Sequence, residues 1–209
     1  PASGHIERFG THVYVAQQQN ISADTTLAEL LGYDAIFAAR TRIDSGHYEP
    51  DDLDTLDGYW DLAERLSQAF IAAKLPPFDP SKRAAELSGG ERIRALLCSA
   101  FTADADYLLL DEPTSNLDIR NQYQVLQITR DLCREQNLTA MIVIHDLNLA
   151  LRFCDRFLLL REGEVYRYGG AEIFDTDALR DVYGVTGSIV DVQGHRLVLI
   201  DDEEKETRS

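Results

Sequence analysis

The sequence predicts an α/β fold in which helices flank a parallel sheet and a helical block is inserted between strands. Two continuous apolar runs, residues 107–110 (YLLL) and 138–144 (LTAMIVI), are typical of strands buried on both faces of a parallel sheet. Residues 120–135 between them carry apolar side chains at helical spacing, and this alternation of strand and helix favours parallel pairing. Residues 26–74 show helical patterns and no strand pattern, so they form the inserted block.

The composition indicates an acidic globular protein. The chain has 209 residues, 44% of them hydrophobic, which is enough for one sizeable core or two small ones. Asp and Glu total 36 against 20 Lys and Arg, so the net charge is −16 and direct binding to nucleic acid is disfavoured. Neither a membrane-spanning run nor a signal peptide is visible in the sequence. Cys98, Cys133 and Cys154 lack CxxC spacing and lie in apolar surroundings, which predicts buried, reduced thiols.

The first half of the chain begins with a strand pattern and continues with helices. Residues 12–16 (HVYVA) predict a strand that leads into Gln17, Gln18, Gln19 and Asn20, which form either a polar surface loop or a strand end that presents glutamine to a site. Thr26 and Glu29 have the spacing of a capping box. An acidic, turn-rich segment follows at residues 44–58, and an apolar stripe predicts a helix over residues 59–74.

A second helix start lies at residues 87–91 (LSGGE). Ser88 and Glu91 also have capping-box spacing, which is the simpler interpretation of this stretch. The cap does not need Gly89 and Gly90, whereas glycines at a helix N-terminus let an anion such as phosphate approach the free N–H groups.

The later strands end in polar pairs. Asp111 and Glu112 follow residues 107–110, before a turn marked by Pro113 and Asn116, and His145 with Asp146 follows residues 138–144. Residues 157–160 predict another strand with a hairpin turn at 162–164, residues 173–183 a helix, and residues 189–200 a hairpin around Gln193 and Gly194 before an acidic tail.

Parallel strands collect their carboxyl ends at one edge of a sheet, which is where ligands bind in open α/β folds. We therefore expect Gln17, Asp111 with Glu112, and His145 to line one cleft near the glycine-rich helix start. Asp111 can hold hydrated Mg²⁺ and Glu112 can orient or deprotonate water, while a histidine can donate to developing phosphate charge. The pattern indicates nucleotide chemistry.

Four motifs in this order resemble the ATP-binding-cassette (ABC) ATPases: LSGGE at 87–91, LLLDEP at 108–113, SNLD at 115–118 and IHDLN at 144–148. The resemblance is specific because all four occur in the family's order and spacing, and it covers nearly the whole chain. It implies a P-loop NTPase-like fold and the hydrolysis of ATP with Mg²⁺ as cofactor. By this likeness Asp111 is the Walker B metal ligand, Glu112 the general base and His145 the switch histidine.

The likeness assigns further residues to the dimer and to the metal. Gln17, or its neighbour Gln18 or Gln19, is the Q-loop glutamine that senses metal and water. The signature that closes on ATP held by a partner subunit comprises Ser88, Gly89, Gly90 and Glu91, and Asp118 is the D-loop residue that spans the dimer.

The two halves of the chain resemble different branches of the family. Residues 115–199, with HDLNLALRFCDRFLLLREGEVYRYGG, resemble the ATPase subunits of iron–siderophore, haem and cobalamin importers. The helical block, from TTLAELLGYDAIFAA to ELSGGERIRALL, resembles the soluble, duplicated ABC-F class that acts on ribosomes. The alternatives are a divergent importer subunit, a natural recombinant and an engineered chimera.

One expected motif does not occur in these 209 residues, namely GxxxxGK[ST], whose backbone and lysine hold the β- and γ-phosphates in the family. In the family the strand before this loop lies inside the sheet. We therefore expect unpaired strand edges or a gap in the sheet, and no tight ATP binding by this chain alone.

Together these observations predict the ATP-hydrolysing subunit, or a fragment of one, of an iron-chelate importer. We expect a transmembrane permease and a second ATPase subunit, arranged head to tail, as partners, with the protein cytoplasmic and peripheral on the inner face of the plasma membrane. The alternatives are an ABC-F ATPase and a fragment without activity. We expect residues 1–20 to hold a core strand and the Q-loop, 21–101 the helical subdomain, 102–185 the remaining core, and 186–209 a hairpin and acidic tail.

Overall fold

The computed structural model describes residues 10–16, 21–103 and 105–201. The chain divides into two compact units, Pro1–Val143 and Ile144–Ser209. Each unit has its own hydrophobic core. The predicted helical block and the strands on either side of it belong to the first unit, whose core draws on both.

Three parallel strands form the sheet of the first unit, as the alternation of strand and helix predicted. They are β1 (His12–Val15), β2 (Tyr107–Asp111) and β3 (Thr139–Val143), in the order β1-β2-β3. Tyr14 lies opposite Leu109, and Leu109 lies opposite Met141. All three strands therefore end at the same edge, where Asp111 is the last residue of β2.

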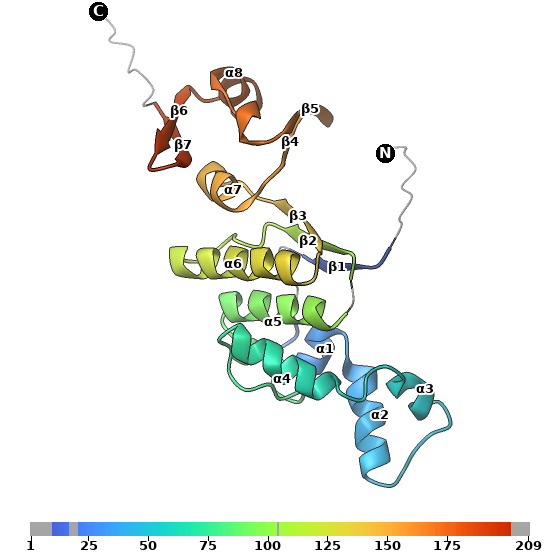
Figure 1. Ribbon diagram of the computed structural model, residues 1–209. Helices are drawn as coiled ribbons and strands as arrows, with labels where there is room; N and C mark the ends of the chain where they lie inside the picture. Colours follow the sequence, from blue (N-terminus) through green and yellow to red (C-terminus); the bar gives the residue numbers. More distant parts are fainter. Residues whose placement is uncertain (1–9, 17–20, 104, 202–209) are drawn as a thin grey trace, which may run out of the picture. The chain divides into compact units, whose positions relative to one another are not determined.

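The prediction that β2 and β3 are buried on both faces is wrong. One face carries buried side chains such as Leu108 and Leu110 and packs on α5 (Gly89–Thr102) and α6 (Ile119–Glu135), which lie on the same side of the sheet (Figure 1). The opposite face exposes apolar side chains, with relative exposures of 55% for Tyr14, 44% for Tyr107, 65% for Met141 and 48% for Val143.

The outer edge of β3 is the second open feature of this sheet. Within the described ranges β3 pairs with β2 alone, and β4 of the second unit pairs with β5. This agrees with the expectation that a sheet lacking the strand before the phosphate loop leaves an unpaired edge.

The inserted block forms α1 (Leu27–Leu31), α2 (Asp34–Asp44), α3 (Asp52–Leu56), α4 (Leu62–Ala72) and the 3₁₀ turn η1 (Ala84–Glu86). The predicted capping box is confirmed, because Glu29 N–H donates to Thr26 Oγ1 at 3.2 Å and Thr26 N–H donates to Glu29 Oε2 at 2.7 Å. Helix α4 is shorter than expected. It lies against α5 (Figure 1), and the buried Arg94 of α5 donates to Ala73 O at 3.0 Å, just beyond the end of α4.

Helix α3 lies inside the segment predicted to be acidic and turn-rich. Its first residue, Asp52, is 2% exposed and accepts hydrogen bonds from the guanidinium of Arg42 and from Glu49 N–H. These bonds hold the pKa of Asp52 below its ordinary value, with the Arg42 contact as the largest cause. The partner of Asp52 lies ten residues away, so a local turn pattern does not reveal this helix.

The second unit contains α7 (Leu147–Phe153) and two hairpins, β4 (Phe157–Arg161) with β5 (Glu164–Gly169) and β6 (Gly187–Val192) with β7 (His195–Ile200). Both predicted hairpins are confirmed. Their two-residue turns have positive φ at both positions, 54° and 84° at Glu162 and Gly163 and 55° and 79° at Gln193 and Gly194, as this kind of turn requires.

The helix expected over residues 173–183 begins later, at Thr176, where α8 (Thr176–Ala178) continues directly into η3 (Leu179–Tyr183), and a break separates it from the short turn η2 (Ala171–Ile173). The break occurs because Phe174 and Asp175 have extended backbone, and Asp175 then caps α8.

The predicted acidic tail beyond Asp201 lies outside the described residues. None of the helices in the described part has the length and apolar character needed to cross a membrane.

The cysteines agree only in part with the prediction of buried thiols. Cys98 is fully buried, and this burial raises the pKa of its thiol to about 12, so it remains protonated and unreactive. Cys133 and Cys154 are only half-buried.

Leu66 and Ile71 of α4 provide a matched test of this packing. Leu66 is 0% exposed and Ile71 is 68% exposed. We expect Leu66→Ala to lower the free energy of unfolding by about 2–5 kcal/mol in urea titrations, because it leaves a cavity. Ile71→Ala should change it by less than about 0.5 kcal/mol. Equal losses in the two variants would contradict the assignment of the buried face.

Candidate functional site

The end of β2 carries the first part of the candidate site. Asp111 is half-buried, and the hydroxyl of Tyr14 donates a hydrogen bond to its Oδ2 at 3.2 Å. Tyr14 lies opposite Leu109, so Tyr14 and Asp111 are diagonal neighbours on one face of the sheet. The hydrogen bond to Asp111 is the main cause that raises the pKa of Tyr14, so the phenol stays protonated and donates. Tyr14 is not among the site residues predicted from the sequence, although the alternation of side chains along a strand was a signal for which face it occupies.

Glu112 follows in the left-handed region, with φ of 47°. This backbone costs a non-glycine residue about 1–2 kcal/mol, so neighbouring contacts must hold it. Ser115 supplies two of them: its N–H donates to Glu112 O at 3.1 Å and its Oγ donates to Glu112 Oε2 at 2.8 Å. The predicted turn is confirmed, and Asn116 within it also has positive φ, at 60°. The turn holds the Glu112 carboxylate at the end of the strand.

The helix start at residues 87–91 is a complete capping box. Glu91 N–H donates to Ser88 Oγ at 3.3 Å, while Ser88 N–H donates to Glu91 Oε2 at 2.8 Å. The hydroxyl of Ser88 and then its backbone N–H lower the pKa of Glu91, so this carboxylate is ionised near the positive end of α5. Glu91 therefore stabilises the start of α5, whether or not it also contacts a nucleotide.

The start of α5 packs on the start of α6. A methyl group on the buried Gly90 would lie 2.7 Å from Asn121 Oδ1, whereas one on the exposed Gly89 would be 3.7 Å from Leu117 Cδ2. Asp118 caps α6 and accepts from Asn121 N–H at 2.8 Å and from Asn121 Nδ2 at 3.0 Å. Gly90 thus has a packing reason that the sequence analysis missed, and Gly89 stays open to a ligand.

The structure does not place two of the predicted site residues, Gln17 and His145, relative to Asp111 and Glu112. Gln17 lies outside the described residues. His145 belongs to the second unit, where it is exposed and precedes Asp146, whose Oδ1 accepts from the N–H groups of Asn148 at 2.9 Å and Leu149 at 3.0 Å. The convergence of Gln17 and His145 on Asp111 therefore stays a prediction. The structure does show that Asp111 and Glu112 adjoin one another and that Gly90 packs against Asn121, which is bonded to Asp118.

The described residues contain no group of three or more His, Cys, Asp and Glu side chains that could hold a metal ion. Mg²⁺ bound with a nucleotide does not need such a cage, because it keeps several waters and takes one or two carboxylates together with the phosphates. Asp111, a half-buried carboxylate at the end of a strand, fits this requirement.

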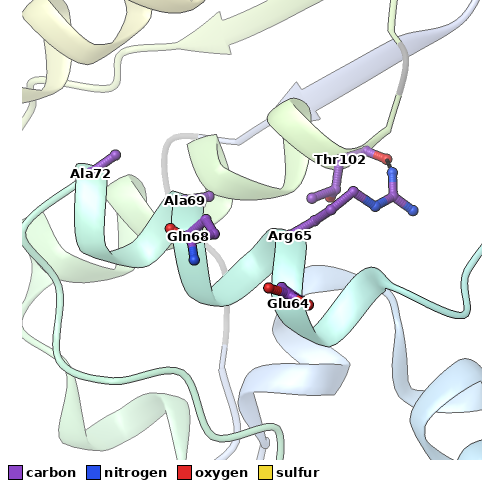
Figure 2. A pocket seen from close by; sticks show the side chains of 6 residues that line it. All are labelled: Glu64, Arg65, Gln68, Ala69, Ala72 and Thr102. Atoms are coloured by element: carbon purple, nitrogen blue, oxygen red, sulfur yellow. Dashed lines mark hydrogen bonds between the residues drawn. The ribbon is translucent and has the colours of Figure 1, made fainter.

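A separate pocket of about 370 Å³ lies in the helical block and contains none of the predicted site residues (Figure 2). It is lined by Glu64, Arg65, Gln68, Ala69 and Ala72 of α4 and by Thr102 of α5. Arg65 donates to Thr102 O at 3.3 Å and to Gly58 O at 3.1 Å, and pairs with Asp61 at 3.1 Å. Because protein groups already engage its guanidinium, the pocket does not indicate an anion site.

Comparison with known proteins identifies the family. The family model described as "ABC transporter" matches residues 4–115, and the chain belongs to this family. The predicted resemblance to ABC ATPases is thus confirmed.

Two relatives and one solved structure show which members of the family this chain is similar to. The chain is 35% identical to the hemin import ATP-binding protein of Bordetella avium strain 197N, over 91% of this chain and 74% of that protein. It is 43% identical to an uncharacterized ABC transporter ATP-binding protein of Methanocaldococcus jannaschii, over 54% of this chain and 45% of that protein. A solved structure described as an inward-facing ABC transporter of metal-chelate type matches with a TM-score of 0.69 at 23% identity, over 97% of this chain and 77% of that chain, which confirms the fold.

The two signature glycines provide a matched pair of variants. We expect Gly90→Ala to lower the free energy of unfolding by about 1–3 kcal/mol, because the new methyl group overlaps the side chain of Asn121. Gly89→Ala should be neutral within about 0.5 kcal/mol, since it meets only an ordinary contact. Denaturant titration measures both values. Adding Asn121→Ala to Gly90→Ala should recover part of the loss, and no recovery would show that the clash is not with Asn121.

The capping carboxylate predicts a pH dependence. The pKa of Glu91 is lowered by folding, so its stabilising contribution is present above its unfolded pKa and is lost as the pH falls through its folded pKa. We expect the difference in unfolding free energy between the wild-type chain and Glu91→Gln to be largest near neutral pH and to shrink below about pH 4. Urea titrations across this range test it, and a difference that does not vary with pH would count against the ionised cap.

Proposed function

We propose that this chain supplies the hydrolytic side of an ABC-type ATP site, and that the assembled protein hydrolyses ATP to import an iron chelate of the hemin type. The observation that carries the proposal is the end of β2, where Asp111 and Glu112 adjoin one another and Ser115 holds the Glu112 carboxylate at 2.8 Å. The hemin import relative supports the substrate class, because it aligns with 91% of this chain and therefore with both halves.

Each residue has a task that follows from its surroundings. Glu112 accepts the proton of the attacking water, and the bond from Ser115 keeps its carboxylate oriented. Asp111 binds Mg²⁺, which when bound neutralises charge on the phosphates. The N-terminus of α5, with Ser88 and the open Gly89, faces the phosphates of ATP held by a second subunit. In the proposed site His145 donates to the developing charge on the phosphate, Gln17 senses metal and water, and Asp118 spans the dimer.

The proposed assembly needs groups that these 209 residues do not contain, since GxxxxGK[ST] is absent from them. In the proposed complex the phosphate loop completes the nucleotide site, a second ATPase subunit faces it head to tail, and a transmembrane permease carries the iron chelate. The protein then lies in the cytoplasm on the inner face of the plasma membrane.

A fusion tests the catalytic assignment. A strand–GxxxxGK[ST]–helix segment from an ABC ATPase is joined before Pro1, and ATP binding and turnover are measured by calorimetry and phosphate release. We expect the fusion to hydrolyse ATP, and Glu112→Gln to keep its affinity while turnover falls at least about 100-fold, because only the general base is lost.

Glu162→Gln is the matched control, because Glu162 is also a turn glutamate with positive φ, at 54°, but it is exposed and lies in the β4–β5 hairpin. Its turnover should equal that of the unmodified fusion. Unchanged turnover in Glu112→Gln, or an equal loss in both variants, would remove Glu112 from the proposed role.

A further inference from the structure

The side chain of Asn148 binds the backbone of Val198, fifty residues further along the chain. Its Oδ1 accepts from Val198 N–H at 2.8 Å, and its Nδ2 donates to Val198 O at 3.3 Å. Val198 is 5% exposed and lies in β7. One side-chain amide thus satisfies both hydrogen-bonding groups of one buried peptide residue.

The geometry of the hairpin explains why both groups are available. Val198 lies opposite Ile189 in the antiparallel pair of β6 and β7. In such a ladder every second residue directs its N–H and C=O away from the partner strand. Asn148 occupies this outer edge as a third strand would, and links α7 to the hairpin.

The hairpin is itself fixed within the second unit. A methyl group on the buried Gly187 would meet Leu199 O at 2.4 Å and Leu179 Cδ1 at 3.2 Å, which shows how closely β6 approaches the helical segment η3. Arg196 donates to Ala171 O at 2.9 Å, and Ile189 packs against the core of the unit. Asn148 is therefore tied to a part of the unit that has its own supports.

On its other side Asn148 belongs to the first turn of α7, a helix of seven residues. A helix this short is not stable by itself and depends on tertiary contacts. Asp146 caps the turn through the N–H groups of Asn148 and Leu149, and His145 comes immediately before Asp146. The contact with Val198 therefore holds the first turn of α7 in place. Because Asp146 is bonded to this turn, the contact also restrains the backbone of the preceding residue, His145.

We propose that Asn148 is a positioning residue for His145, and that the β6–β7 hairpin supports the switch histidine through the Asn148–Val198 contact. The coupling is a property of the second unit. Its importance for catalysis rests on the proposed function, in which His145 contacts the phosphate.

The coupling is tested in the 209-residue chain by NMR of the histidine ring Cε1–Hε1 resonances, with His145→Gln to identify the peak of His145. We expect Asn148→Ala to shift and broaden the His145 resonance, and Asn148→Asp to do so more strongly, because a carboxylate oxygen replaces the donor that faces Val198 O. His12 and His47, both in the first unit, should keep their positions. An unchanged His145 resonance in both variants would overturn the proposal.

Arg196→Met is the matched control, because it removes a different hydrogen bond of the hairpin and leaves Asn148 intact. It should leave the His145 resonance in place. An equal shift in Arg196→Met would show that any loosening of the second unit moves His145, and would overturn a specific role for Asn148.

The same variants in the fusion separate the coupling from the function. Asn148→Ala should lower kcat about tenfold with KM unchanged, as the loss of one or two hydrogen bonds that position a catalytic group allows. If the His145 resonance moves but His145→Ala leaves kcat unchanged, the coupling is confirmed and the catalytic role of His145 is wrong. If His145→Ala lowers kcat but Asn148→Ala does not, Asn148 has no positioning role.

Discussion

The close packing of α5 on α6 is the constraint on which the candidate site of the first unit depends. Gly90 allows the start of α5 to approach Asn121, and Asn121 is in turn bonded to the cap residue Asp118. The turn from Glu112 to Asp118 joins the end of β2 to the start of α6. A single small residue, Gly90, therefore allows α5 to pack against the segment that follows Asp111 and Glu112.

The sequence predicted those features that depend on near neighbours. Both capping boxes and both hairpin turns follow from residues two to three positions apart, and the structure has all of them. Helix α3 and the contact between Asn148 and Val198 depend on partners ten and fifty residues away, which local patterns do not reveal. The apolar runs predicted the strands, but not which faces would be covered, because that depends on how the layers are arranged.

The sequence predicted which residues form the candidate site more fully than it predicted the contacts that orient them. Asp111 and Glu112 were identified from their place after an apolar strand, yet the contacts that orient them come from Tyr14 and Ser115. Ser88 and Glu91 fit a helix cap and a nucleotide signature equally well in sequence. The structure shows that the cap is complete, so a phosphate would meet a helix start that is already formed.

The open side of the sheet affects how copies of this chain behave toward one another. Among the described residues no strand pairs with the outer edge of β3, beside exposed Met141 and Val143; such an edge is a template for pairing with another strand and promotes self-association. The net charge of −16 opposes this, because like-charged copies repel. Salt screens that repulsion but leaves apolar attraction intact, so the colloidal stability of the isolated chain falls as ionic strength rises.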